Sequence, residues 1–140
     1  MKRSAAEIAT QLGLAPHPEG GWYRETFRHS PEDGSRGDLT AIYFLLDDGP
    51  GSAWHRVTDG DEVWCFHEGD PLELTIETAT GEEHVTILGP SVGADHELQA
   101  VVPRGAWQKA RSLGAWSLVS CVVGPAFVFE SFEMREASDG

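Results

Sequence analysis

The stretch GPGSAWHRVTDGDEVWCFHEG, residues 49–69, holds a histidine and a glutamate seven positions apart, His55 and Glu62. An imidazole and a carboxylate can share a proton, move a proton on a bound molecule, or coordinate a metal ion. Which of these applies depends on whether the two side chains reach the same space. The strands that carry them therefore decide the chemistry that is open to them.

Alternation along residues 62–67 predicts where these side chains point. Glu62 and Trp64 share one strand face, whereas His67 lies on the other. The four residues TDGD join two short strands, and a hairpin at this point would make His55 and Glu62 near cross-strand neighbours. A carboxylate on an aromatic face is costly unless it is paired or solvated. We therefore expect both groups to line a barrel cavity.

The segment resembles the first motif of the cupin superfamily, G-x5-H-x-H-x4-E-x6-G, with Val57 at the second histidine position. The second cupin motif is matched at Pro103 and Gly105 only. Its histidine position holds Gln108. Two of the four ligand positions of a metal-binding cupin are thus occupied by other residues.

Two further stretches narrow the resemblance. HPEGGWYRETFR at residues 17–28 and HRVTDGDEVWCFHEGDPLEL at residues 55–74 are similar to one family of small single-domain cupins of unknown function, often labelled predicted sugar epimerases. The resemblance spans about residues 12–132. It implies an all-β fold, the double-stranded β-helix or cupin jelly-roll barrel, usually paired as a homodimer.

The resemblance also implies roles for single residues. Metal-independent sugar-nucleotide epimerases of the superfamily use a histidine base, a carboxylate that steadies it, and a tyrosine acid. In this chain His55 is the expected base, Glu62 its orienting carboxylate and Tyr43 the acid, with Tyr23 as the other candidate. Further expected ligand contacts are Trp64, Gln108, Glu19 and Arg24.

These residues favour a small-molecule-binding cupin, with isomerase or epimerase activity on a sugar-like or polar metabolite and no metal cofactor. A first alternative is a metal-dependent cupin enzyme that holds a divalent metal with His55, Glu62 and Gln108. Two strong ligands and an amide are a poor set for zinc, which prefers three or four strong donors. A second alternative is a non-catalytic ligand-binding or storage protein.

Charge and length exclude other classes of partner. The chain has 140 residues and a formal charge of −13, so it should be repelled by nucleic acid and by anionic membranes. Its two cysteines lack the spacing of a metal or redox motif. The first residues lack the apolar run of a signal peptide, and a cytoplasmic location is the expectation.

The elements that must position the site read as one cupin domain over residues 1–140. A helix at about 4–13 is predicted by the capping box of Ser4 and Glu7 and by Gly13 at the end. After it, turn clusters separate short apolar runs, which predicts a barrel at about 22–133. The expected strands are 22–28, 39–46, 53–57, 62–67, 72–78, 83–88, 97–102, 107–111, 115–122 and 126–133.

Overall fold

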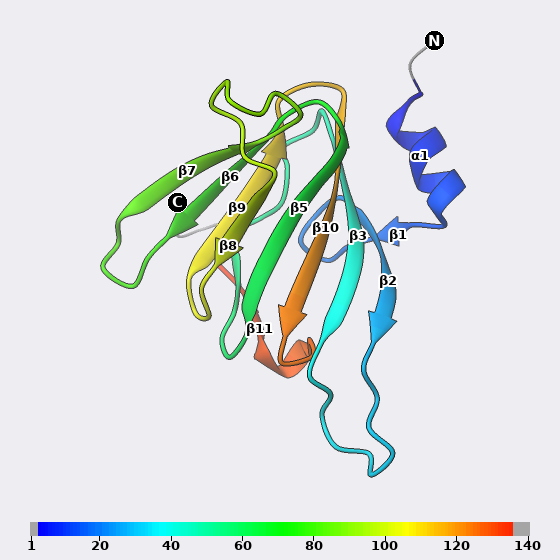
Figure 1. Ribbon diagram of the computed structural model, residues 1–140, viewed down its shortest axis with the longest axis vertical. Helices are drawn as coiled ribbons and strands as arrows, with labels where there is room; N and C mark the ends of the chain where they lie inside the picture. Colours follow the sequence, from blue (N-terminus) through cyan, green and yellow to red (C-terminus); the bar gives the residue numbers. More distant parts are fainter. Residues whose placement is uncertain (1–2, 136–140) are drawn as a thin grey trace.

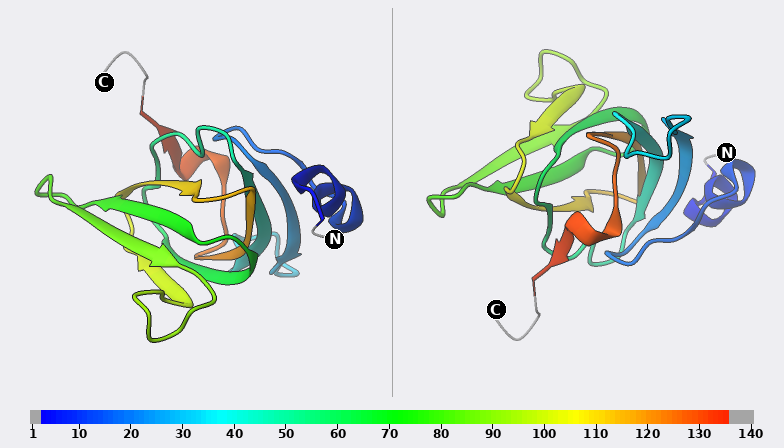
Figure 2. Two further views of the ribbon diagram at one scale, coloured as in Figure 1. Left: turned by 90° about the horizontal axis from the view of Figure 1, so that it is seen from above. Right: turned by 90° about the horizontal axis from the view of Figure 1, so that it is seen from below.

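Short strands with alternate apolar side chains pair into two antiparallel sheets in the computed structural model, which describes residues 3–135. The larger sheet has the order β1 (Ala15–Pro16), β2 (Trp22–Arg28), β3 (Thr40–Asp47), β10 (Trp116–Gly124), β5 (Asp61–Gly69) and β8 (Gln99–Val102). The smaller sheet has the order β11 (Phe132–Met134), β4 (His55–Val57), β9 (Trp107–Ser112), β6 (Leu72–Glu77) and β7 (Glu83–Leu88). The two sheets curve around a shared interior (Figures 1 and 2). The expected jelly-roll fold is confirmed.

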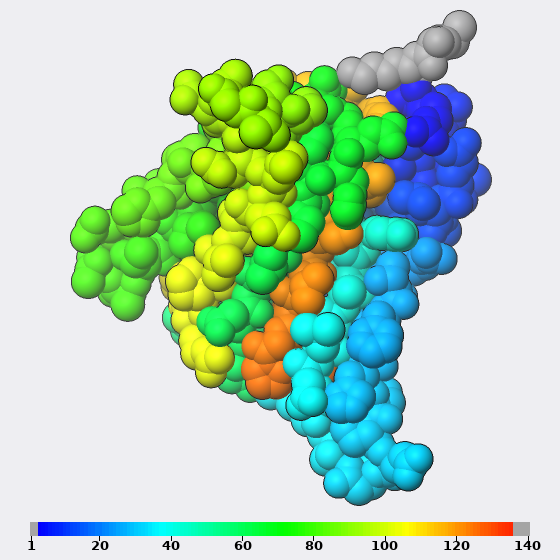
Figure 3. Space-filling view, in the orientation of Figure 1, coloured from blue at the N-terminus to red at the C-terminus, as the bar shows by residue number. Residues whose placement is uncertain are grey.

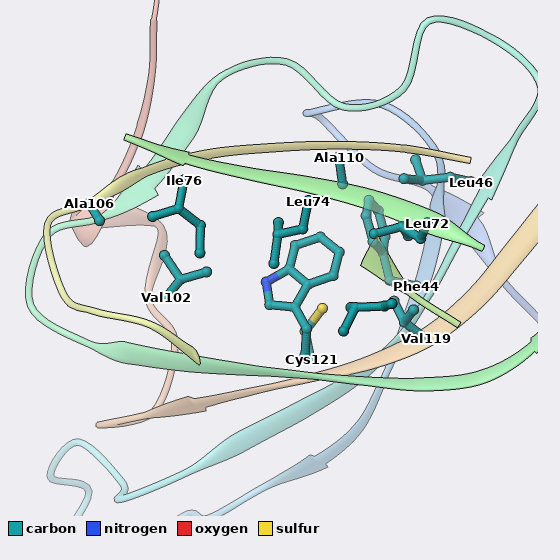
Figure 4. Packing of buried hydrophobic residues seen from close by; sticks show 12 residues of the cluster. Phe44, Leu46, Leu72, Leu74, Ile76, Val102, Ala106, Ala110, Val119 and Cys121 are labelled. Atoms are coloured by element: carbon teal, nitrogen blue, oxygen red, sulfur yellow. The ribbon is translucent and has the colours of Figure 1, made fainter. Parts of the chain in front are cut away.

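The inward side chains of the two sheets fill most of that interior. Phe44 from β3, Leu74 from β6 and Val119 from β10 are buried in one cluster, and Figure 4 shows them with Val102 and Cys121 between the sheets. Burying a large apolar side chain stabilises the folded state by about 1.5–3 kcal/mol. This cluster occupies one part of the barrel and leaves the other part for the polar groups described below.

The helix α1 (Ala5–Leu12) lies outside the barrel, against the larger sheet (Figure 2). Ser4 and Glu7 form the capping box, and Gly13 ends the helix with a positive φ of 67°. Ile8 packs on the outer side chains of β3 and β10, among them Leu45. The predicted helix is thus confirmed, and its apolar face shows which side of β3 points outward. No helix among residues 3–135 has the length and apolar composition needed to cross a membrane.

The predicted strands agree with the structure in most of the chain, and two expectations were wrong. Residues 126–133 were expected to form one strand, but a loop leads to the 3₁₀ helix η1 (Phe129–Ser131), and only β11 is extended. Backbone hydrogen bonds explain this break, because the Phe127 N–H donates to the Thr40 hydroxyl and the Ser131 N–H to the Val128 carbonyl.

The expected hairpin between His55 and Glu62 was also wrong. β4 belongs to the smaller sheet and β5 to the larger one, so the TDGD connection crosses between the sheets. His55 pairs with Gln108 of β9, and Glu62 pairs with Val102 of β8. The two side chains therefore face each other across the interior and are not neighbours on one ladder.

Candidate active site

The loop HPEGG, residues 17–21, brings two ionisable side chains into the barrel. A backbone hydrogen bond of 2.9 Å from the His17 N–H to the Gly21 carbonyl closes the loop, and the Ala53 N–H donates to the Glu19 carbonyl at 2.8 Å. Gly21 has a φ of +80°, and a Cβ there would lie 2.6 Å from the Leu45 carbonyl oxygen. Glycine alone permits this close approach to β3, and the approach holds Glu19 over the interior.

A cavity of about 210 Å³ opens beneath this loop. Its residues are His17, Glu19, Tyr23, Glu25, Arg28, Thr40, Ile42, His55, Val57, Glu62, Cys121, Val123, Phe127, Phe129 and Phe132. The burial of these residues separates a floor from a mouth. His55 is 2% exposed, and Glu19 and Glu62 are each 7% exposed, whereas Phe129 is 57% exposed. His55, Glu19 and Glu62 thus lie at the closed end of the cavity, whereas the exposed pair Glu25 and Arg28 lies toward solvent.

At the floor, His55 and Glu19 share a proton. The Nδ1–H of His55 donates to the Ala53 carbonyl at 2.8 Å, so Nε2 carries the lone pair of the neutral ring. That Nε2 lies 2.5 Å from Glu19 Oε2, a buried oxygen with no other partner among residues 3–135. Two acceptor atoms approach this closely only with a proton between them. A single proton between Nε2 and Oε2 accounts for a distance this short.

The electrostatics of the floor favour the charged imidazole. Burial by itself lowers the pKa of His55, but the Coulomb attraction and hydrogen bonding of Glu19, with Glu62 adding to them, outweigh it and leave the pKa raised. The charged form of the His55 imidazole is thus stabilised by its carboxylate neighbours. The ring of Phe132 stacks on His55 at 5.7 Å between centroids and limits its access to water.

His17 has the opposite character. The Glu19 N–H donates to His17 Nδ1 at 3.1 Å, so the neutral ring carries its proton on Nε2. Burial lowers the pKa of His17, with Coulomb repulsion from His55 acting in the same direction and attraction from Glu19 opposing it. The ring packs edge-to-face on Tyr23, with 4.5 Å between centroids. His17 is thus a neutral hydrogen-bond donor beside a charged histidine.

Glu62 is held by a chain of hydrogen bonds that ends in the core. The indole N–H of Trp64 donates to Gln108 Oε1 at 2.9 Å, and Gln108 Nε2 donates to Glu62 Oε1 at 2.7 Å. Burial raises the pKa of Glu62 in spite of its attraction to His55. The Cys121 thiol also hydrogen-bonds Glu62, and burial raises the pKa of that thiol well above its ordinary value. Glu62 is therefore a carboxyl group that favours its neutral form.

Four of the predicted site residues come together in this cavity, namely His55, Glu62, Glu19 and Tyr23, the second candidate for the acid. The partner of His55 differs from the expectation. The 2.5 Å contact of His55 is with Glu19, and no ion pair joins His55 to Glu62 among residues 3–135. The carboxylate in contact with His55 thus comes from the loop at residues 17–21 and not from β5.

Tyr43 and Arg24 lie on the outer face of the larger sheet and away from the cavity. Figure 3 views this face, on which β3, β10, β5 and β8 lie side by side. The Arg24 guanidinium sits 5.6 Å from the Tyr43 ring centre, and that ring packs edge-to-face on His67. Alternation along β3 is the cause, because Phe44 points inward and Tyr43 must then point outward. His67 lies outside the barrel, as its position in the strand predicted.

Trp64 and Gln108, expected as ligand contacts, lie behind the cavity wall. Each is 1% exposed, and their mutual hydrogen bond leaves the Gln108 amide directed at Glu62. They position Glu62 and do not line the cavity.

His17, Cys121 and Phe132 line the cavity but were not among the predicted site residues. The Gly-Gly pair after Glu19 was the one available signal for the loop, because it marks a close backbone approach.

The donors do not form a metal site in this arrangement. Among residues 3–135, no group of three or more histidine, cysteine, aspartate or glutamate side chains is placed to hold an ion. Gln108 presents its NH₂ toward Glu62, since the Trp64 indole occupies its oxygen, and an amide NH₂ is not a ligand. Val57 supplies a buried apolar side chain where a second histidine would stand. The set His55, Glu62 and Gln108 therefore does not match the requirements of a divalent metal.

Comparison with known proteins gives the family context. A family model described as "Cupin superfamily (DUF985)" matches residues 6–135. The crystal structure of protein SO0799 from Shewanella oneidensis is similar, with 34% identity, a TM-score of 0.91, and coverage of 99% of this chain and 88% of that one. A hypothetical protein from Leishmania major has 32% identity and a TM-score of 0.86, covering 97% and 89% of the two chains.

More distant structures share only the fold. KdgF from Halomonas sp. has 20% identity and a TM-score of 0.58, with 80% of this chain and 86% of that chain covered. Oxalate decarboxylase from Bacillus subtilis, described with Mn(II) centres, has 16% identity and a TM-score near 0.65, with 96% of this chain and about a third of that chain covered. No curated protein matched the chain.

Proposed function

We propose, from the premise that the chain belongs to the DUF985 family of the cupin superfamily, that it is an isomerase. It would move a proton next to the carbonyl group of a small molecule without a metal. The observation that carries this proposal is the buried 2.5 Å contact between His55 Nε2 and Glu19 Oε2 at the floor of the cavity. A pair that holds one proton between an acid and a base can both remove and return a proton.

The contact between the two side chains and the raised pKa of His55 suggest the two roles. Glu19 is the carboxylate and accepts the proton of the carbon next to the ligand carbonyl, so the C–H electron pair moves into an enol. The raised pKa of His55 makes its imidazolium the acid that protonates the carbonyl oxygen. Glu19 then returns its proton to the former carbonyl carbon while the neighbouring hydroxyl gives its proton back to His55, which completes an aldose–ketose type shift. This assignment makes Glu19 the base, a role first expected for His55.

Other groups at the floor stabilise the oxygen on which charge develops. Burial raises the pKa of Glu62 and so favours its neutral carboxyl form, which can donate a hydrogen bond. The Nε2–H of His17 is a second neutral donor that faces the same cavity. Donors fixed before the reaction are worth about 3–4 kcal/mol each in the transition state. Together these groups supply an acid, a base and an oxyanion site.

Deuterium exchange tests the proposal directly. The protein is incubated in D₂O with a panel of small hydroxyketones and hydroxyaldehydes, and loss of the proton next to the carbonyl is followed by NMR. We expect exchange with the unaltered protein and a loss of at least about 100-fold in Glu19→Gln and His55→Gln, since a general acid or base contributes about 10²–10⁴-fold.

A matched control is Glu73→Gln. Glu73 lies on β6 outside the cavity, where it pairs with Arg111, and the same chemical change there should leave exchange unaltered. Urea unfolding confirms that each variant is folded. Exchange at the unaltered rate in folded Glu19→Gln and His55→Gln would overturn the proposal.

A further inference from the structure

The walls of the cavity differ from its floor in a way that limits the ligand. We infer that the ligand is amphipathic, with one uncharged carbonyl or hydroxyl head and an apolar body, and that it is neither a polyol nor an anion. The inference concerns the same cavity as the isomerase proposal and rests on that proposal only for the carbonyl chemistry of the head.

The mouth is built from aromatic side chains. Phe127, Phe129 and Phe132 contact one another edge-to-face, with ring centroids 5.0, 5.8 and 6.2 Å apart. Their positions follow from the turn of η1, which brings the segment after β10 back over the opening. Phe129 remains 57% exposed, and covering this ring with a ligand would remove apolar surface from water.

The side walls are also apolar. Val57 of β4 and Val123 of β10 face the cavity from the two sheets, and Ile42 of β3 lies beside them. The polar lining outside the floor is limited to Tyr23, the Arg28–Glu25 pair and Thr40, whose hydroxyl already accepts from the Phe127 N–H. A sugar carries a hydroxyl group on nearly every carbon, and a hydroxyl buried against Val57, Val123 or Ile42 would meet no partner. Leaving buried hydroxyl groups unpaired weakens binding. A ligand with a single polar end satisfies the floor and fills the rest of the cavity with carbon.

Charge excludes an anionic head group. Arg28, the one arginine or lysine of the cavity lining, gives its guanidinium to Glu25, with nitrogen–oxygen distances of 2.7 and 3.2 Å. The imidazolium of His55 is already paired with Glu19. A phosphate or carboxylate at the floor would therefore lie beside Glu19 and meet no lining arginine or lysine that is free of a partner. The volume of about 210 Å³ lies below the roughly 300–1,000 Å³ of drug-sized sites, which indicates a small molecule.

Three probes with related heads test the inference by calorimetric titration. Phenacyl alcohol joins a hydroxyketone to a phenyl ring, dihydroxyacetone has the same kind of head without an apolar body, and dihydroxyacetone phosphate adds an anion. We expect phenacyl alcohol to bind at least about tenfold more tightly than dihydroxyacetone. The phosphate should bind more weakly than either. Equal or tighter binding of dihydroxyacetone or its phosphate would overturn the inference, as would a lack of binding by phenacyl alcohol.

Two alanine variants locate the apolar body. Phe129→Ala should weaken the binding of phenacyl alcohol about fivefold, because the ring loses its contact at the mouth. Phe27→Ala is the matched control, since Phe27 is 52% exposed on β2 and does not line the cavity. Equal effects of the two substitutions would contradict the placement.

The two proposals fail separately. Tight binding of phenacyl alcohol without deuterium exchange would support the ligand class and refute the isomerase. Exchange on dihydroxyacetone, together with its tighter binding, would support the isomerase and refute the ligand class.

Discussion

Replacing Glu19 with glutamine should reverse the direction in which the pKa of His55 is shifted. In the unaltered protein, burial lowers this pKa and the Glu19 carboxylate more than offsets the effect. A glutamine side chain has nearly the same size and no charge. With the carboxylate removed, burial becomes the dominant influence, and we expect the pKa of His55 to fall below its ordinary value of about 6.5.

The loss in the free energy of unfolding caused by Glu19→Gln follows from the burial of Glu19 and His55. Glu19 is 7% exposed and His55 is 2% exposed, so both charges are largely removed from water. Removing one partner of a buried pair costs about 3–5 kcal/mol, and we expect the lower end because His55 can become neutral. An ordinary domain has about 5–15 kcal/mol of stability, so the variant should remain folded at neutral pH.

The dependence of stability on pH should change sign. A raised pKa in the folded state gives stability that is full below the unfolded value and is lost as pH rises through the folded value. A lowered pKa does the reverse, so stability of Glu19→Gln should rise with pH up to about 6.5. Each single group contributes a slope of at most about 1.4 kcal/mol per pH unit.

Urea unfolding between pH 5 and pH 8.5, followed by tryptophan fluorescence, measures the stability, and NMR titration of the imidazole protons measures the pKa. Glu62 is present in both proteins, so subtracting the parent's free energy of unfolding from that of the variant at each pH reduces the contribution of Glu62 titration. Glu73→Gln is the control for the loss of one carboxylate. A pKa of His55 that stays raised in Glu19→Gln would refute the assignment of Glu19 as its charge partner.

The remaining predictions concern the groups around this pair. Glu62→Gln should gain stability relative to the parent as pH rises above about 4.3, because burial raises the pKa of Glu62 and ionisation of this carboxyl group opposes folding. The same urea series measures this difference in stability, and a difference that is constant at all pH values would contradict the prediction. Gln108→Met should cost about 2–4 kcal/mol in the free energy of unfolding, since it leaves the Trp64 N–H unpaired and removes one of the hydrogen bonds to Glu62. A cost below about 1 kcal/mol would argue against the chain of hydrogen bonds. Gly21→Ala should lower both the melting temperature and deuterium exchange more than Gly34→Ala, because both glycines have positive φ but only Gly21 faces the Leu45 backbone at 2.6 Å. Treatment with EDTA should leave deuterium exchange unchanged, and recovery of lost exchange by added Mn²⁺ would point to a metal instead. The homodimer stays a prediction, and light scattering after size-exclusion chromatography should give twice the mass of one chain.

Strand alternation is the part of the site that could be predicted from the sequence. It placed Glu62 on the inner face and His67 on the outer face without any knowledge of the fold. The turn residues between apolar runs predicted nine of the strands approximately, and the capping box predicted the helix. Period and capping are local properties, so local sequence suffices for them.

The partners of these residues could not be predicted in the same way. A four-residue connection suits a hairpin as well as a crossing between sheets, so the position of His55 relative to Glu62 depended on the tertiary arrangement. The loop that carries Glu19 has no periodicity from which a direction could be read. Tyr43 was misplaced because the inward face of β3 is decided by where α1 packs, on Leu45.

The residues of the site come from distant parts of the chain, so the site can form only late in folding. Glu19 comes from a loop before β2, His55 pairs with Gln108, and Glu62 pairs with Val102. Contacts between residues far apart in sequence form slowly, because the loop between them must close first. During refolding, the far-ultraviolet signal of the strands should therefore recover before the titration of His55 does. The shared proton is a marker for completed closure of the barrel, and a chain that has its strands but lacks this closure would be inactive.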